Sequence, residues 1–183
     1  MEQINAKLTN DGMFMGCFEP QRLRKKRLFN KFIKPFNFIY YCSDFIFKRV
    51  FPKLPVTKKI YFFITGGRNR VISKAEMFGR LYSCGFKLCS EQIIDYSHYF
   101  IAQKIKEPVF DMSPTYGVFI KLKRVGKGGK LIRVYKFRTM HPFSEYIQDY
   151  IHENNDLDKG GKFNNDFRIS TLGRIMRKLW IDE

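Results

Sequence analysis

Cysteine, histidine and tryptophan are scarce in this chain of 183 residues, which contains four cysteines, three histidines and one tryptophan. The cysteines show no Cys-x-x-Cys spacing and the histidines are scattered, so a zinc site is not expected. Cys84 and Cys89 would pair only across the turn that holds Gly85, and free thiols in a reducing compartment are the simpler interpretation.

Long apolar runs are also missing from the sequence. No uninterrupted stretch reaches the ~20 apolar residues that a membrane-spanning helix needs. The first residues are polar, and they lead to neither the apolar core nor the small-residue cleavage site of a signal peptide. The chain is therefore not expected to carry a signal peptide or to cross a membrane as a simple helix.

Acidic residues are the third shortage, because 17 Asp and Glu stand against 34 Lys and Arg and leave a net charge of +17. Such an excess predicts attraction to polyanions: nucleic acid, anionic lipid or a phosphorylated substrate. An apolar content of 44% and an aromatic content of 17% indicate a folded chain. Its length suits one domain or two small ones.

The first third of the chain changes character at residue 21. Residues 1–20 contain glycine and proline and are expected to form an irregular, mobile lead-in. Over residues 21–51, a basic cluster precedes apolar residues at helical spacing, with Pro35 as the expected break. Three interpretations fit this segment: a helix that lies in a membrane interface, a helix that packs on the protein's own core, or a basic patch that binds nucleic acid. Its aromatic density favours the membrane. The candidate membrane-contacting residues are Arg24, Lys25, Lys26, Arg27, Phe29, Phe32 and Phe36.

Residues 57–106 are expected to form a small unit of one helix and one β-hairpin. Ser73 and Glu76 have the spacing of a capping box, which predicts that a helix begins there. Apolar and polar residues then alternate over 86–94 and again over 98–105, as the two strands of a hairpin would.

Two glycine-rich strings have two interpretations each. Gly66-Gly67-Arg68-Asn69-Arg70 is either a basic loop before a helix or a phosphate-binding segment. Gly126-Lys127-Gly128-Gly129-Lys130 lies between two runs rich in Val, Ile, Tyr and Phe, which predicts a strand-turn-strand unit with positive φ at the turn. A phosphate cradle is the alternative there, although the spacing of a P-loop is absent. Further on, helices are expected over 143–153 and 171–180.

Six short strings follow one another in the last part of the chain: Arg124-Val125-Gly126-Lys127, Tyr135-Lys136-Phe137-Arg138-Thr139-Met140, Arg168-Ile169, Leu172-Gly173, Arg177-Lys178-Leu179 and Asp182-Glu183. This series resembles the bacterial sugar transferase family, whose members are monotopic polyprenyl-phosphate phosphoglycosyl transferases. The resemblance covers about residues 107–183 and corresponds to the front part of the family's catalytic domain, with the chain ending at the Asp-Glu pair. The apolar re-entrant helix typical of the family has no counterpart over 93–115, so residues 21–51 would have to contact the membrane.

The resemblance implies transfer of a sugar-1-phosphate from a nucleotide-diphosphate sugar to a polyprenyl phosphate carrier. It implies that Asp182 and Glu183 are catalytic, with Asp182 as the nucleophile and Glu183 as a ligand of Mg²⁺. Lys136, Arg138 and Arg177 are the candidate ligands of the substrate phosphates. From the residues alone, the two acids are also explained as solvated groups at a frayed end. Lys136 and Arg138 could instead form a solvent-facing polar row on a strand. Arg177 could instead complement the dipole at the C-terminus of its helix.

The expected fold is therefore α+β. It would comprise a basic amphipathic N-terminal segment over 1–56, the helix-hairpin unit over 57–106 and a partial sugar transferase domain over 107–183. The expected partners are a nucleotide sugar, polyprenyl phosphate, an anionic membrane surface at the cytoplasmic face of the inner membrane, and a chain that supplies the rest of the domain. Truncation is expected to impair activity. The alternative hypothesis is a non-catalytic fragment that binds membrane or a partner. A nucleic-acid-binding protein is the third and least favoured hypothesis.

Overall fold

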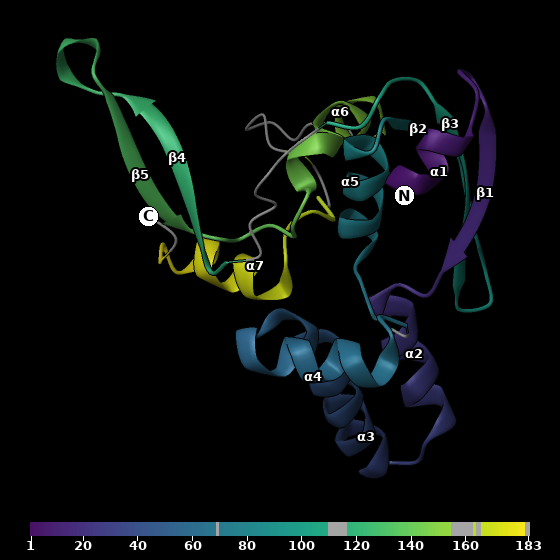
Figure 1. Ribbon diagram of the computed structural model, residues 1–183. Helices are drawn as coiled ribbons and strands as arrows, with labels where there is room; N and C mark the ends of the chain where they lie inside the picture. Colours follow the sequence, from purple (N-terminus) through teal and green to yellow (C-terminus); the bar gives the residue numbers. More distant parts are fainter. Residues whose placement is uncertain (69, 110–116, 155–162, 164–165, 182–183) are drawn as a thin grey trace. The chain divides into compact units, whose positions relative to one another are not determined.

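The computed structural model describes residues 1–68, 70–109, 117–154, 163 and 166–181 (Figure 1). The chain divides into two compact units, Met1–Val109 and Phe110–Glu183. Helices accompany a three-stranded sheet in the first unit and a two-stranded sheet in the second, so the expected α+β class is confirmed. Within the described ranges, none of the helices combines the length and apolar character needed to cross a bilayer.

The sheet of the first unit is antiparallel, with the strand order β1-β3-β2. Its strands are β1 (Met13–Phe18), β2 (Phe86–Ile94) and β3 (Ser97–Lys104). The hairpin expected over 86–105 is confirmed by β2 and β3, and Asp95 takes a positive φ of 53° at the turn between them.

The expectation of an irregular lead-in over residues 1–20 is wrong. Residues Glu2–Lys7 form helix α1, and β1 pairs with β3 along its whole length. The physical reason is an inward row with a period of two, in which Phe14, Gly16 and Phe18 are less exposed than their neighbours. Gly16 lies opposite Phe100, and a Cβ at that glycine would come within 2.7 Å of the Phe100 ring. The aromatic side chain thus occupies the space that the glycine leaves.

Helix α5 (Lys74–Ser83) supplies much of the core of the first unit. It begins as the capping box predicts, because the Ser73 hydroxyl accepts a hydrogen bond of 3.1 Å from the backbone N–H of Glu76. Phe78 is completely buried, and its ring contacts those of Phe18 and His98. Leu81 is also fully buried, and each such side chain contributes about 1.5–3 kcal/mol through burial.

A buried polar cluster holds α1 in place. The Asn5 side chain donates to the backbone carbonyls of Cys84, at 2.8 Å, and Lys106, at 3.0 Å. The Lys104 ammonium donates back to the carbonyls of Asn5, at 3.0 Å, and Leu8, at 3.2 Å. Because the Asn5 amide nitrogen and the Lys104 ammonium both have partners, the first helix is anchored by hydrogen bonds to residues about 80 to 100 positions further along the chain.

The segment between β1 and α5 is helical. Its elements are α2 (Gln21–Lys31), α3 (Phe36–Phe45), the π-helical turn η1 (Ile46–Val50), the 3₁₀ turn η2 (Phe51–Lys53) and α4 (Pro55–Thr65). The break expected at Pro35 is confirmed, since that residue is the N-cap of α3. Ring contacts of Phe29 with Tyr41 and of Phe32 with Tyr40, at 5.8 Å and 4.6 Å between centroids, pack α2 on α3.

The second unit contains the predicted central hairpin, with β4 (Phe119–Val125) paired to β5 (Leu131–Phe137). Gly128 and Gly129 take φ values of 69° and 76° at its tip, as the turn interpretation requires. The helix expected over 143–153 is present as the 3₁₀ turn η4 (Ser144–Ile147) followed by α6 (Gln148–Asn154), and the last expected helix is α7 (Thr171–Lys178). Ile147 and Ile151 are fully buried.

Candidate functional site

Two of the three predicted phosphate-binding residues, Arg138 and Arg177, lie where hydrogen bonds connect the end of β5 to α7. The Thr139 carbonyl, two residues beyond β5, accepts hydrogen bonds from the backbone N–H of Ser170, at 2.9 Å, and from its hydroxyl, at 3.1 Å. The same hydroxyl accepts from the N–H of Gly173 at 2.9 Å and so caps α7. We call this arrangement the β5–α7 junction, comprising Arg138, Thr139, Ser170, Gly173 and Arg177.

Gly173 allows this close approach. A Cβ at this position would lie 1.9 Å from the Thr139 carbonyl oxygen, which is far inside van der Waals contact. Any larger residue must therefore push the first turn of α7 away from Thr139. The Leu172-Gly173 string thus has a steric explanation in this fold.

The junction positions Arg177 through Thr139. The Arg177 Nε donates a hydrogen bond of 3.1 Å to the Thr139 hydroxyl. Arg138 precedes Thr139 in the chain, and its Nε donates to the Gly117 carbonyl at 2.9 Å. Burial lowers the pKa of the Arg138 guanidinium, and the charge of Glu145 opposes that shift. A guanidinium remains charged at neutral pH in such surroundings, so both arginines present positive charge here.

Lys136 lies on the adjoining strand. It stands opposite Ile120 in the β4–β5 ladder, two residues before Arg138. The ladder continues past the strand end, because the Arg138 N–H donates to the Val118 carbonyl at 2.7 Å. Residues two apart in extended backbone project to the same face, so Lys136 and Arg138 share a face of the hairpin. The structure thus places the three predicted cations along one segment and the helix joined to it.

The sequence interpretation missed a buried ion pair beside this junction. Arg168 and Asp166 are 4% and 7% exposed, and the guanidinium bonds both carboxylate oxygens at 2.8–3.1 Å. Arg168 also donates to the Gln148 side chain on α6. Burial raises the pKa of Asp166, but the hydrogen bonds and charge of Arg168, together with the charge of Arg177, lower it below the usual value. The Arg168-Ile169 string contains one partner of this pair, but no local pattern identifies the other.

The predicted catalytic residues Asp182 and Glu183 lie outside the described residues. Among the residues that are described, no three His, Cys, Asp or Glu side chains gather as metal ligands. Asp166 is engaged by Arg168 and does not offer a free carboxylate to a cation. The roles of Asp182 and Glu183, including the binding of Mg²⁺ by Glu183, therefore stay predictions.

The candidate membrane-contacting residues of α2 have different surroundings. Arg24 bonds Asp44 at 2.6 and 2.7 Å and Glu19 at 2.7 Å, and its side chain is 14% exposed. Arg27 also bonds Glu19, at 2.8 Å, but stays 45% exposed. Phe29 and Phe32 pack on α3, whereas the charged Lys25 and Lys26 and the ring of Phe36 are exposed. Membrane contact by these residues stays a prediction.

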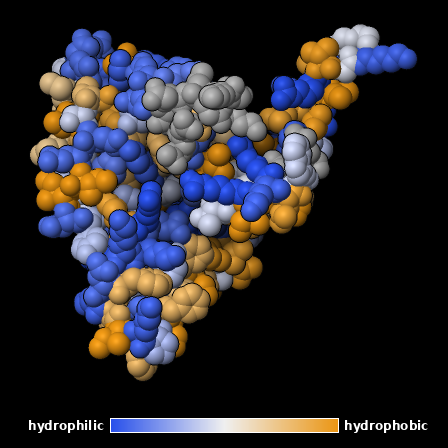
Figure 2. Space-filling view, turned by 180° about the vertical axis from the view of Figure 1, so that it is seen from behind, coloured by the Kyte–Doolittle hydropathy of each residue, from blue (hydrophilic) through white to orange (hydrophobic). Residues whose placement is uncertain are grey.

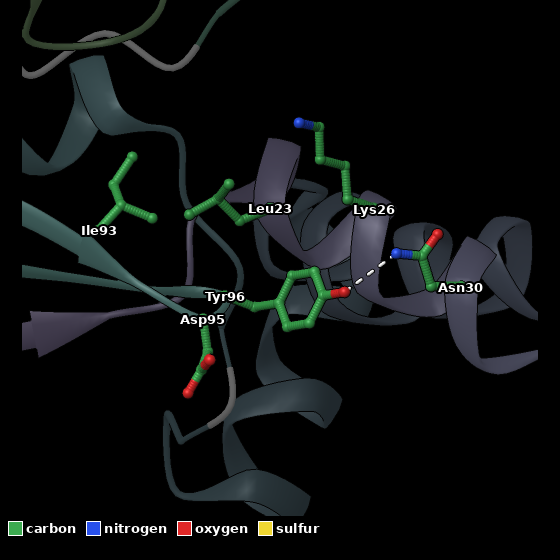
Figure 3. Close-up of a pocket in the computed structure, with 6 residues that line it drawn as sticks. All are labelled: Leu23, Lys26, Asn30, Ile93, Asp95 and Tyr96. Atoms are coloured by element: carbon green, nitrogen blue, oxygen red, sulfur yellow. Dashed lines mark hydrogen bonds between the residues drawn. The ribbon is translucent and has the colours of Figure 1, made fainter.

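Lys26 also lines an open pocket of about 510 Å³ between α2 and the β2–β3 turn (Figure 3). The other lining residues are Leu23, Asn30, Ile93, Asp95 and Tyr96. The Asn30 amide donates to the Tyr96 hydroxyl at 3.0 Å, as the dashed line in Figure 3 shows. A carboxylate among these residues disfavours a phosphate, and none of the predicted phosphate-binding residues lines this pocket.

Comparison with known proteins identifies the segment that contains the β5–α7 junction. Residues 100–183 match the family described as "Bacterial sugar transferase". This segment is similar to bacterial sugar transferases. We refer to residues 100–183 below as the sugar transferase segment, and its match confirms the resemblance found over 107–183.

Two curated proteins share similarity with the chain. A galactosyl transferase, CpsE, from Streptococcus agalactiae serotype III (strain NEM316) is 39% identical over 61 residues. An undecaprenyl-phosphate galactose phosphotransferase from Salmonella typhimurium (strain LT2) is 38% identical over 66 residues. Each match covers 33% of this chain and spans only 14% of the relative's length. No solved structure matches significantly.

Proposed function

We propose that the sugar transferase segment transfers a sugar-1-phosphate from a nucleotide-diphosphate sugar to a polyprenyl phosphate carrier. The product would serve the assembly of exopolysaccharide, capsule or O-antigen. The observation that carries this proposal is the family match over residues 100–183. A relative named as an undecaprenyl-phosphate galactose phosphotransferase supports the choice of a lipid phosphate acceptor.

The cations of the segment would neutralise the donor diphosphate. Lys136 and Arg138 share a face of the hairpin, and Arg177 is held at the neighbouring Thr139 by a hydrogen bond of 3.1 Å. Guanidinium groups bind phosphate oxygens through parallel N–H donors, and an ammonium adds a mobile point charge. Charge placed in advance where a leaving phosphate develops negative charge lowers the barrier to its departure.

The chemistry would proceed in two displacements. The Asp182 carboxylate attacks the phosphorus that carries the sugar, a new P–O bond forms, and the nucleoside monophosphate leaves with the electron pair of the broken P–O bond. An oxygen of polyprenyl phosphate then attacks the same phosphorus and releases the Asp182 carboxylate unchanged. Glu183 would hold Mg²⁺, which supplies charge neutralisation for the diphosphate. The reaction would take place at the cytoplasmic face of the inner membrane.

A non-catalytic role in binding membrane or a partner protein is the second candidate. The observation that favours it is the short matched length, 14% of each relative. Binding without turnover needs only the surfaces of the chain, whereas turnover needs a complete site.

The deciding experiment measures nucleoside monophosphate release. The full chain is incubated with anionic vesicles, Mg²⁺, polyprenyl phosphate and a panel of uridine-diphosphate sugars, beside Asp182→Asn and the control Asp149→Asn, which changes an exposed acid on α6. Release by the parent and the control, with loss by at least ~10³-fold in Asp182→Asn, would support a covalent role for Asp182. Equal release by both variants would contradict it. No release by a folded parent would leave the binding role.

The cations are tested in the same assay. Lys136→Ala is compared with Lys123→Ala, which removes an exposed lysine from the opposite strand of the hairpin. We expect a loss of about 10–100-fold in kcat/KM for Lys136→Ala and none for Lys123→Ala, because of these two lysines only Lys136 is proposed to contact the diphosphate. An equal loss in both variants would indicate a general effect of hairpin charge.

A further inference from the structure

Two helices of the first unit turn apolar stripes to solvent. On α4, the stripe comprises Val56, Ile60, Phe63 and Ile64, with exposed fractions of 76%, 57%, 91% and 67%. On α3 and its continuation η1, the stripe comprises Phe36, Ile39, Tyr40 and Ile46, with exposed fractions of 68%, 58%, 49% and 48%. We call these eight residues the α3–α4 apolar surface. Figure 2 shows apolar residues, in orange, gathered among hydrophilic ones toward the lower, helical end of the first unit.

Each stripe follows the period of its helix, so it forms one continuous face. On α4, residues 60, 63 and 64 lie four, seven and eight positions after residue 56. On α3, residues 39 and 40 lie three and four positions after residue 36, and Ile46 lies seven positions after residue 39. The opposite side of α4 is occupied, because Tyr61 is 1% exposed and its ring packs on Phe47 at 5.4 Å. The stripes are therefore an additional surface beyond the core, and such contiguous exposed patches mark interaction sites.

The segment that contains this surface is rich in positive charge. Residues 21–70 contain fourteen Lys and Arg but a single acidic residue, Asp44. That carboxylate is 8% exposed and bonds Arg24 at 2.6 Å and Lys48 at 3.1 Å. Four exposed lysines are close to the stripe residues in the sequence: Lys31, Lys34, Lys58 and Lys59. The helices thus offer apolar side chains and uncompensated positive charge together.

We propose that the α3–α4 apolar surface docks on an anionic lipid bilayer, with Phe63 and its neighbours in the headgroup region and the lysines at the lipid phosphates. A helix with an apolar aromatic face and flanking lysines lies in the plane of such an interface. Nucleic acid needs the charge but offers nothing to cover aliphatic side chains as exposed as Val56 and Ile64. A neutral protein groove would cover the stripes but leave the lysines without counter-charges.

Apart from Phe36, which belongs to both sets, this surface differs from the residues that the sequence alone suggested. Arg24, Phe29 and Phe32 of α2 are engaged within the unit, and the apolar side chains that reach solvent lie on the two following helices. The inference deepens the membrane location in the proposed function, yet its test needs no turnover. A failure of docking and a failure of catalysis can therefore be told apart.

The test is co-sedimentation of the full chain with vesicles of phosphatidylcholine alone or with anionic phosphatidylglycerol. Phe63→Ser/Ile64→Ser alters the α4 stripe, and Met13→Ser/Met15→Ser alters two residues of β1 that are 64% and 72% exposed. We expect the partition coefficient on anionic vesicles to fall at least about tenfold in the first variant and to stay unchanged in the control. Circular dichroism verifies that both variants fold.

The charge contribution is measured separately. Lys58→Gln/Lys59→Gln should reduce binding to anionic vesicles by about fivefold per residue, whereas Lys87→Gln/Lys106→Gln, at exposed positions elsewhere in the unit, should change it little. Absence of binding by the folded parent, or equal binding by parent and Phe63→Ser/Ile64→Ser, would overturn the proposal. Salt-sensitive binding to duplex DNA in place of vesicles would also overturn it and support the nucleic-acid alternative.

Discussion

The two units of this protein are stabilised in different ways. The first unit buries a set of aromatic and aliphatic side chains, among them Phe78, Phe86 and Phe100, between α5 and the three-stranded sheet. In the described part of the second unit, the fully buried apolar residues are Ile147 and Ile151, and the elements are joined by polar contacts at the β5–α7 junction. Hydrogen bonds and ion pairs depend on exact partners, whereas apolar packing tolerates changes that keep volume.

This difference in stabilisation bears on the proposed phosphate binding by the sugar transferase segment. The polar contacts that stabilise the second unit involve the same region as the proposed phosphate ligands. Arg177, for example, bonds Thr139 and also lowers the pKa of Asp166 through its charge. Substitutions there are expected to alter stability and ligand binding together, whereas substitutions in the core of the first unit should alter stability alone.

The largest effect is expected from emptying the apolar core. Phe78→Ala should lower the free energy of unfolding of the first unit by about 3–5 kcal/mol, because a fully buried ring is replaced by a cavity. Phe62→Ala, on the half-buried side of α4, should cost less, and chemical denaturation followed by circular dichroism compares the two. Equal losses would show that α5 does not carry the core.

Breaking the buried ion pair should have a similar effect, confined to the second unit. Arg168→Met leaves Asp166 buried without its partner, which costs about 3–5 kcal/mol. Hydrogen exchange should then report loss of protection in α6 and α7 but not in α5, with the exposed Arg133→Met as control. Loss of protection in both units alike would contradict a local role.

The same pair makes the second unit sensitive to acid. The folded pKa of Asp166 is lowered, so the carboxylate contributes stability above its unfolded pKa of about 3.9 and loses it as the pH falls through the folded value. Asp166→Asn should remove this part of the acid dependence, which is measured by hydrogen exchange in α6 and α7 across the acid range.

An intermediate effect, with the same sign in pH but in the alkaline range, is expected in the first unit. Burial, partly offset by Glu76, lowers the pKa of Lys53 from 10.5 to about 8. Between these values the unfolded chain binds more protons than the folded one, so stability should rise with pH by about 1–3 kcal/mol. Lys53→Met should abolish the rise in denaturation midpoints between pH 8 and 10. A rise that persists in this variant would assign it to another group.

The smallest effect on stability is expected at the N-terminal caps of α5 and α7. Ser73 accepts one hydrogen bond at the start of α5, whereas Ser170 accepts one from Gly173 and also donates to the Thr139 carbonyl. Ser73→Ala should cost about 1 kcal/mol, and Ser170→Ala about 1 kcal/mol more. Thermal unfolding of the two variants measures the difference, and equal losses would show that the Thr139 contact adds nothing.

Features specified by neighbouring residues could be predicted from the sequence. The cap at Ser73, the break at Pro35 and the glycine turn at the tip of β4–β5 depend on a few adjacent positions, and all three are present. Strand β1 could not be predicted, because its partners on β3 lie about 80 to 90 residues further along the chain and Gly16 interrupts its apolar row.

The candidate site was predicted only in part for the same reason. The order of the family's strings identified Lys136, Arg138 and Arg177, but the contact that positions Arg177 depends on Gly173 meeting Thr139 across the fold. The pairing of Arg168 with Asp166 likewise depends on burial, which no short string records. The solvent-facing stripes of α3 and α4 became visible only when the packed side of each helix was known.

The two-stranded sheet formed by β4 and β5 leaves one outer edge on each strand that no other described strand covers. Uncovered edges can pair with a second copy of the same hairpin. Here Lys121, Lys123, Arg124 and Arg133 place like charges along both strands, so two hairpins repel each other. Salt screens that repulsion. A concentrated salt buffer should therefore promote self-association and precipitation of this chain, and low ionic strength should keep it monodisperse.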